Sequence, residues 1–325
     1  MNRLKKMYCR VFQTGLKAAL PFLPYRKPRI VGSVKALPEV IQKKSCSKVL
    51  FITDAGIRKL GLTRRLEKAL DDAGIPYCTD AQTRYKYAIN DFPLIPRYAV
   101  LDPKVTLSLP PFITATTGMD ALTHAVEAYI GNSTTYGTRK DALLAVKLIF
   151  ENIDTAYEDG SNVEARRNML HASFYAGCAF TKSYVGYVHA IAHSLGGEYN
   201  VPHGLANAVI LPMLLEAYGE KIHKKLARLA VAAGIADEDT PRDEAAGRFI
   251  QAVKDMKKRF GIGDHIPEIR ETDIPKLAHY ADKEANPLYP VPVLMDASEL
   301  EPFYHKLMSG PEASSENTAE KGDQA

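Results

Sequence analysis

The sequence lacks the paired cysteines that zinc ribbons and redox motifs need. Its four cysteines, Cys9, Cys46, Cys78 and Cys178, stand far apart, and none belongs to a Cys-x-x-Cys pair. The sequence also has no apolar run near the roughly 20 residues that span a bilayer. Its N-terminus shows no long apolar stretch followed by a small-residue cleavage site. We therefore expect a soluble cytoplasmic protein without a transmembrane segment.

Excess charge of one sign is scarce as well. Lys and Arg number 42 and Asp and Glu number 38, so the net charge of +4 is too small to indicate a nucleic-acid partner. Much of this excess lies in residues 2–29, which carry no acidic residue. The basic residues of that stretch are Arg3, Lys5, Lys6, Arg10, Lys17, Arg26, Lys27 and Arg29.

Basic and apolar residues are interleaved along the same stretch. The pattern predicts a basic amphipathic N-terminal helix within residues 1–29, ended by Pro21 and Pro24. Two interpretations remain open. The more frequent one is a solvated helix packed on the main body, and the other is an anchor at a membrane surface.

Clustered glycines are absent from the first third of the chain. Before Gly118 the glycines are Gly15, Gly32, Gly56, Gly61 and Gly74, none of them close to another. Binding of a pyrophosphate needs clustered glycines at a strand-to-helix turn, because backbone N–H groups must approach the phosphates. The sequence therefore contains no ordinary dinucleotide phosphate loop.

The 325 residues that are present, 46% of them hydrophobic, are enough for two domains with substantial cores. Residues 30–112 have an α/β pattern of nucleotide-binding type, with short apolar strands at 30–34, 48–53, from 77 and at 98–101, and helices from 40 and over 58–73. The continuous apolar run at 48–53 predicts a buried parallel strand.

Residues 113–308 have helical periodicity throughout and predict an all-α domain. The predicted helices cover residues 120–130, 139–153, 163–181, 188–195, 205–218, 221–233 and 244–260. Residues 309–325 are polar and small, which predicts a disordered tail.

Asp120 and His124 form the first candidate metal-ligand pair. They lie four residues apart, so one helix places both side chains on the same face. An alternative needs no metal: Thr117 would be an N-cap and Asp120 the third helical residue of a capping box. Taken alone, that alternative is the stronger one.

His189, His193 and His203 form a second cluster, three of the nine histidines within 15 positions. A single histidine on an apolar helix is more often an ordinary core residue, but three at this spacing are improbable as scatter. We expect Gly196 and Gly197 to end one helix, so that His203 at the start of the next approaches His189. Imidazole and carboxylate ligands suit Zn²⁺ or Fe²⁺.

These motifs resemble those of the iron-containing (group III) alcohol dehydrogenases. The stretch 176–207 is similar to the histidine signature of that family, and residues 118–124 are similar to its first ligand pair. The resemblance extends from about Gly32 to Met308 and includes residues 48–56, 87–91 and 286–287. It implies a Rossmann-like α/β domain followed by an all-α domain.

The resemblance also implies site roles. The four metal ligands would be Asp120, His124, His189 and His203, binding Fe²⁺ or Zn²⁺. His193 would lie near the nicotinamide and relay a proton. Asp54 would bind the adenosine ribose and favour NAD, because a carboxylate there repels a 2′-phosphate. The implied reaction is alcohol/aldehyde interconversion by hydride transfer to NAD, with the metal as Lewis acid.

One departure from the family lies in the α/β half. The family's glycine-rich turns have no counterpart, and about ten residues connect the segment 74–78 to the segment 87–91. Two βα units of about 30 residues each would fit between them in the family. We therefore predict a shortened Rossmann-like domain with its seam near residues 80–85.

Three functions remain open from the sequence. The first is an NAD-dependent alcohol dehydrogenase that acts on a small alcohol or aldehyde and is impaired by loss of the phosphate loops. Such an enzyme is also a candidate homo-oligomer. The second is a metal-binding remnant without dehydrogenase activity. A metal-dependent hydrolase is third, because Glu127 and Glu198 are the only acidic residues in the ligand motifs besides Asp120.

Overall fold

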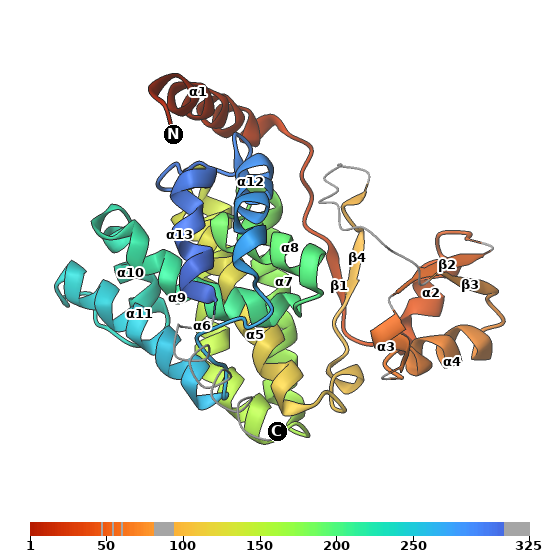
Figure 1. Cartoon of the computed structure of the whole chain (residues 1–325). Coiled ribbons are helices and arrows are strands. Elements are labelled where there is room, and N and C mark those ends of the chain that lie inside the picture. Colours follow the sequence, from red (N-terminus) through yellow and green to blue (C-terminus); the bar gives the residue numbers. More distant parts are fainter. Residues whose placement is uncertain (47, 54, 60, 81–93, 309–325) are drawn as a thin grey trace, which may run out of the picture.

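The computed structural model describes residues 1–46, 48–53, 55–59, 61–80 and 94–308. A body of packed helices forms most of the molecule, with the α/β part beside it and the N-terminal helix across its top (Figure 1). Asp54, the seam at 81–85, the segment 87–91 and the tail 309–325 lie outside the described residues, so the predictions on them remain predictions.

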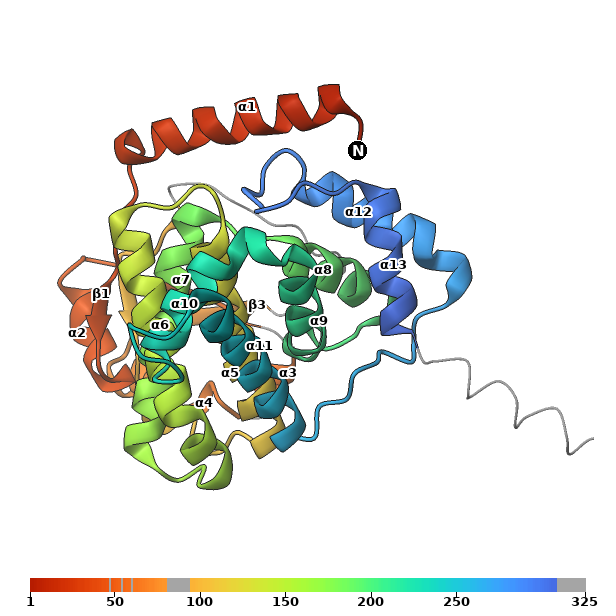
Figure 2. The same cartoon turned by 90° about the vertical axis from the view of Figure 1, so that its left-hand side faces the viewer.

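The predicted basic helix is present as α1 (Arg3–Ala19), followed by η1 (Leu20–Phe22). The Asn2 side chain caps its first turn by accepting from the backbone N–H of Lys5 at 2.8 Å. Figure 2 shows α1 as a separate rod above the helical body.

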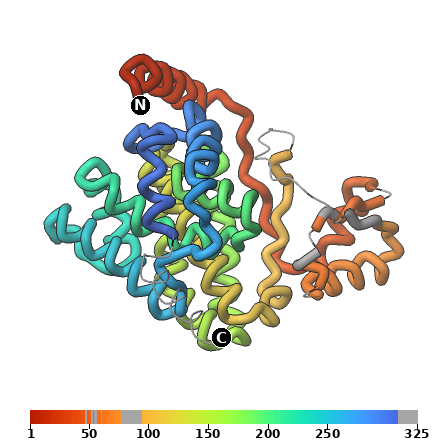
Figure 3. Tube along the Cα trace, viewed as in Figure 1, coloured from red at the N-terminus to blue at the C-terminus, as the bar shows by residue number. Residues whose placement is uncertain are grey.

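In the described residues of the α/β part, the strands form short parallel pairs and not one sheet. The elements of this part are β1 (Arg29–Val31), η2 (Val34–Ala36), α2 (Leu37–Gln42), β2 (Val49–Ile52), α3 (Ala55–Lys59), α4 (Arg64–Asp72), β3 (Tyr77–Asp80), β4 (Tyr98–Val100) and η4 (Pro103–Val105). Among the described residues, β1 pairs only with β4 and β2 only with β3, both in parallel. The tube in Figure 3 shows the second pair set apart from the first.

Two predictions for this part are wrong. The strand at 48–53 is not buried, because β2 has one partner strand among the described residues and Leu50 keeps 62% of its surface exposed. The helix predicted over 58–73 is divided into α3 and α4, since Gly61 between them adopts a left-handed φ of 69°.

The all-α part follows, as predicted. Its helices are α5 (Pro111–Ile130), α6 (Tyr136–Glu158), α7 (Val163–Ser183), α8 (Tyr187–Tyr199), α9 (His203–Tyr218), α10 (Glu220–Ala232), α11 (Arg242–Arg259), η5 (Glu271–Asp273), α12 (Ile274–Ala285) and α13 (Ala297–Leu307). Helices α5, α6 and α7 pack on one another, and α9 packs on both α5 and α8 in the core.

Three details of these helices differ from the predictions. α5 begins at Pro111, well before Asp120. α8 continues through Gly196 and Gly197 and ends instead at Asn200, which adopts the left-handed conformation with φ 57°. α12 and α13 were not predicted. Among the described helices, none combines the length and apolarity needed to cross a membrane.

Candidate metal centre

Helix α5 carries the first two candidate ligands. Asp120 and His124 lie one turn apart in its interior, and Asp120 Oδ2 is 4.0 Å from His124 Nδ1. The capping-box alternative is wrong, because Thr117 lies within the helix and its hydroxyl donates to the Ile113 carbonyl at 2.7 Å. Helix capping therefore does not explain why a carboxylate stands at position 120.

His189 and His203 reach Asp120 from two further helices. His189 lies in α8 and His203 is the first residue of α9. The start of α9 passes very close to α5, because a Cβ on Gly204 would lie 2.5 Å from the Thr116 carbonyl oxygen. Glycine at this position thus permits the approach of His203 to Asp120.

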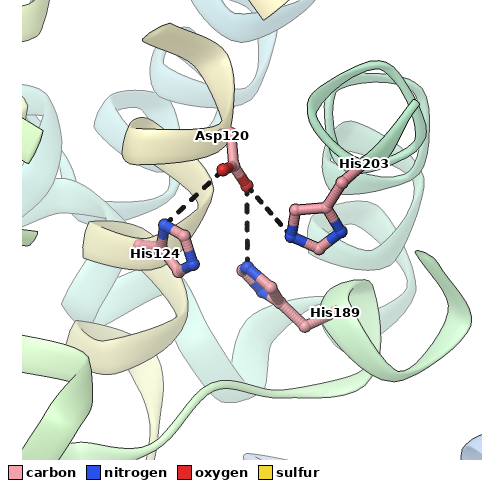
Figure 4. Close-up of side chains that lie close together, drawn as sticks. All are labelled: Asp120, His124, His189 and His203. Carbon is pink, nitrogen blue, oxygen red and sulfur yellow. Dashed lines mark ion pairs between the residues drawn. The ribbon is translucent and has the colours of Figure 1, made fainter. Parts of the chain in front are cut away.

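The four side chains converge on one point (Figure 4). Asp120 Oδ1 is 3.7 Å from His189 Nε2 and 3.5 Å from His203 Nε2. One ligand atom from each of Asp120, His124, His189 and His203 lies within 4.8 Å of all the others. This is the arrangement that three nitrogens and one oxygen need to surround a divalent ion.

Burial keeps two imidazoles of this cluster, those of His124 and His189, neutral. It lowers the pKa of His189 to about 3 and that of His124 to about 4. Burial alone would raise the pKa of Asp120, but the neighbouring imidazoles of His124, His203 and His189 lower it overall. At neutral pH the cluster therefore offers the carboxylate of Asp120 and the neutral imidazoles of His124 and His189, the protonation states that bind metals.

The sequence identified Glu127 only as an acidic residue of the ligand motifs, and its contact with His189 was not predicted. Glu127 Oε2 lies 2.6 Å from His189 Nδ1, and the two oxygens of Glu127 also accept the backbone N–H groups of Gly186 and Val188, each at 2.9 Å. The close packing requires Gly186, where a Cβ would lie 2.6 Å from Glu127 Oε1. Burial raises the pKa of Glu127 to about 7, against the lowering effect of these N–H donors.

This contact selects the tautomer of His189. An ionised Glu127 can only accept, so Nδ1 of His189 carries the proton and Nε2 keeps its lone pair. That Nε2 is buried, has no hydrogen-bond partner and faces Asp120. A buried nitrogen without a hydrogen-bond partner, pointing toward other possible metal ligands, fits a bound metal ion. The signal was in the sequence: Asp120, His124 and Glu127 are spaced four and three apart on one helix face.

Asn207 supports the opposite side of the cluster. It lies one turn after His203 in α9 and is fully buried. Its amide donates to Asp120 Oδ1 at 2.6 Å and lies 3.1 Å from His203 Nε2. It thereby fixes the orientation of the only carboxylate in the group.

His193 lies beside the cluster but is not one of its four members. Its ring stacks on that of His203 at 5.1 Å between centroids. Its Nδ1 is 2.7 Å from Glu284 Oε1, an oxygen that also accepts from the Tyr289 hydroxyl at 2.7 Å. Glu284 in α12 and Tyr289 just after that helix lie far from His193 in sequence, so no local pattern revealed them.

The aromatic residues before His189 divide between site and core. Phe180 stacks on His124 at 4.4 Å between ring centroids and therefore walls the cluster. Tyr187 is fully buried and donates to the Met295 carbonyl at 2.7 Å, which identifies it as a core residue.

Comparison with known proteins gives a consistent set of relatives. The model of the Fe-containing alcohol dehydrogenase family, C-terminal, matches residues 114–308. A 1,3-propanediol dehydrogenase from Citrobacter freundii is 40% identical over 210 residues, 64% of this chain and 54% of that protein. Alcohol dehydrogenase 4 from Saccharomyces cerevisiae is 38% identical over 211 residues, 64% and 54% of the two chains. This chain spans about half the length of the curated relatives it matches.

Solved protein structures are also similar to this chain. A crystal structure of a 1,3-propanediol oxidoreductase superposes with a TM-score of 0.78 at 25% identity, over 86% of this chain and 97% of that chain. An alcohol dehydrogenase from Oenococcus oeni superposes with a TM-score of 0.76 at 22% identity, over the same shares. The second similarity supports the fold alone.

Proposed function

This chain belongs to the Fe-containing alcohol dehydrogenase family, and we propose that it is a metal-dependent alcohol dehydrogenase that interconverts small alcohols and aldehydes with NAD. The observation that carries the proposal is the convergence of Asp120, His124, His189 and His203 within 4.8 Å. The relatives support the substrate class, because their names include 1,3-propanediol and 1-propanol dehydrogenases.

The metal ligands in this proposal are Asp120, His124, His189 and His203. Three imidazole nitrogens and a carboxylate fit Fe²⁺ and Zn²⁺ alike, so the residues do not choose between them. When bound, either ion supplies Lewis-acid chemistry towards the alcohol or aldehyde oxygen. Glu127 holds His189 in the tautomer with a free Nε2 lone pair, and Asn207 orients Asp120.

His193 is the proposed proton carrier. With Nδ1 turned to Glu284, its Nε2 remains available to accept or return a proton. Tyr289 shares the same Glu284 oxygen and keeps that carboxylate in place. Four other residues supply the proposed metal ligands, so His193 is free for this role.

The cofactor half of the proposal depends on the shortened α/β part. We keep Asp54 as the proposed ribose-binding residue, which would favour NAD over NADP. The phosphates would lack a glycine-rich turn, since Gly56, Gly61 and Gly74 are dispersed. We therefore propose that the chain binds NAD weakly and turns over slowly. We also propose that it lies in the cytoplasm. Free thiols at Cys9, Cys46 and Cys178 fit a reducing compartment.

A second function is favoured by one specific observation. The strands of the α/β part form two separate two-stranded pairs among the described residues. Such pairs are marginally stable alone and form a poor base for a dinucleotide site. The alternative is a metal-binding chain without dehydrogenase activity.

One experiment separates the two functions. The iron-loaded or zinc-loaded chain is given 1,3-propanediol or 1-propanol with NAD at millimolar concentration, and NADH formation is followed at 340 nm as the standard readout of hydride transfer. The proposed function predicts slow NADH formation that His203→Ala abolishes. A rate equal to that of His203→Ala, in a chain that holds its metal, would establish the alternative.

A further inference from the structure

Helix α1 turns an apolar face to solvent. Leu4 and Val11 leave 74% and 68% of their surfaces exposed, and Met7, Tyr8 and Phe12 are exposed beside them. We call these five residues the α1 stripe. Leu4, Tyr8 and Val11 are spaced four and three apart, so they form one continuous row along the helix. A row of exposed apolar residues on one helix face marks an interaction surface.

The opposite, polar face of α1 holds the helix on the body. The Arg10 guanidinium donates to the carbonyls of Val291 and Pro292 at 2.8 and 2.9 Å. The Gln13 amide, which is buried, donates to the Tyr289 carbonyl at 2.8 Å. The helix is therefore fixed with its apolar face outward, the reverse of an ordinary surface helix.

Further contacts fix the same orientation. Lys5 Nζ forms an ion pair with Asp282 at 2.7 Å, and Cys9 is buried against the helical core. Because these anchors lie along half the helix, α1 cannot roll its stripe inward without breaking them. The stripe is therefore exposed because specific contacts hold α1 in this orientation, and not because α1 is loosely packed.

The charges around the stripe indicate what binds it. Residues 2–29 contain no acidic side chain, and Arg3 and Lys17 of α1 are exposed, while Lys6 forms an ion pair with Glu299 at 3.8 Å. Pairing of two α1 stripes from two copies would bring these like charges together, which is unfavourable. A partner with an apolar surface bordered by negative charges would bury the stripe and pair with the basic residues.

The position of α1 suits a flat partner. Both views show α1 lying along the outer edge of the helical body, with no element outside it (Figures 1 and 2). Directly after the helix, Phe22 leaves 87% of its surface exposed. A planar surface can thus approach α1 from the side on which no element of the described chain lies.

We propose that the α1 stripe binds the surface of an anionic lipid bilayer, with α1 parallel to the membrane plane. Apolar side chains would enter the boundary between headgroups and acyl chains, and the basic residues would meet the anionic headgroups. The protein binds there peripherally. This inference is independent of the dehydrogenase proposal, since no metal ligand lies in α1.

The test is co-sedimentation of the full metal-loaded chain with lipid vesicles. We expect binding to vesicles of phosphatidylcholine mixed with phosphatidylglycerol, weakened by salt, and much less binding to phosphatidylcholine alone. Lys17→Glu should weaken binding to the mixed vesicles roughly thirtyfold, since it changes the local charge by two units. Leu4→Asp combined with Val11→Asp should abolish it.

Matched controls keep the test specific. Phe112→Asp in α5 and Lys258→Glu in α11 make the same kinds of change at exposed positions of other helices, and should bind vesicles like the unchanged chain. Unchanged metal content shows that each variant is folded. Two results would overturn the inference: equal or no binding to both kinds of vesicle, and a solution dimer that Leu4→Asp converts to a monomer, which would make the stripe a self-association surface.

Discussion

The two halves of the molecule differ in how completely they are built. The helical part buries large side chains such as Tyr187, Phe249 and Tyr304 completely and brings four metal-binding residues together from α5, α8 and α9. In the described residues of the α/β part, Val34, Leu70 and Ile75 are the buried apolar side chains, while Ile30 and Leu50 are exposed.

The difference teaches which chemistry depends on which half. Every proposed metal ligand and each residue that orients one comes from the helical part, so the metal centre needs nothing from the strands. The nucleotide site of an α/β fold depends on the sheet and its turns, and here that sheet is divided. Loss of one activity therefore need not remove the other.

The largest predicted effect concerns NAD. Charge-assisted bonds to a pyrophosphate contribute about 1.5–3 kcal/mol each, so losing three weakens binding by roughly 4 kcal/mol or more, about a thousandfold. Asp54 is proposed to contact the ribose and not the phosphates, so it would not restore this loss. Calorimetric titration of the metal-loaded chain should give a dissociation constant near the millimolar range. A micromolar value would mean that other residues rebuild the phosphate site.

The second effect lies in the helical half. Glu127→Gln places an amide beside His189 Nδ1, which removes the preference for the tautomer with a free Nε2. Loss of such a supporting contact weakens metal binding by about 10–100-fold. Competition with a chelator measures it. Glu284→Gln, which contacts His193 instead, is the matched control and should retain normal affinity. Equal affinities for both variants would contradict the role of Glu127.

A smaller effect is the pH dependence of the metal-free chain. His124 and His189 have folded pKa values lowered to about 4 and about 3, so the unfolded state binds up to two more protons below its pKa of about 6.5. The raised pKa of Glu127, about 7, opposes this by one proton between about pH 4.5 and 6.5.

The net difference of about one proton sets the expected slope. The stability contributed by the neutral imidazoles is present above pH 6.5 and is lost as the pH falls, by roughly 1.4 kcal/mol per unit between pH 6.5 and 4.5. Urea unfolding of the metal-free chain across this range measures the slope. Stability that rises on acidification would contradict the buried neutral histidines.

The smallest predicted effect on the metal is that of His193→Ala. His193 lies beside the four candidate ligands and is held by Glu284, so its removal should leave the metal content unchanged while any turnover falls. Elemental analysis together with the NADH assay checks both. Loss of the metal would identify His193 as a ligand.

The sequence predicted the convergence of the four candidate ligands for a physical reason. Asp120 and His124 share a helix face by spacing alone, and a helix periodicity is a local property that sequence reports directly. Glu127 lies on the same helix face by spacing, but its role could not be predicted from spacing alone. It depends on hydrogen-bond donors such as the N–H of Gly186, which lies 59 residues later. Glu284 and Tyr289 had no local signal at all.

Other features depended on context that sequence does not carry. The apolar run of β2 predicted burial, but burial of a strand needs neighbours on its faces and edges, and β2 pairs with a single strand in the described chain. Pro275 and Pro302 weakened the helical pattern of α12 and α13, although one lies in the first turn, where it is tolerated.

The most direct test of the account is the metal content of the purified chain. Elemental analysis after growth with iron and zinc should find about one equivalent of divalent metal per chain, lost in His189→Ala and in His203→Ala. His223→Ala, which removes a histidine paired with Asp243 outside the centre, should retain it. A complete metal centre in the helical half predicts this result. Less than about a tenth of an equivalent in the unchanged chain would contradict it.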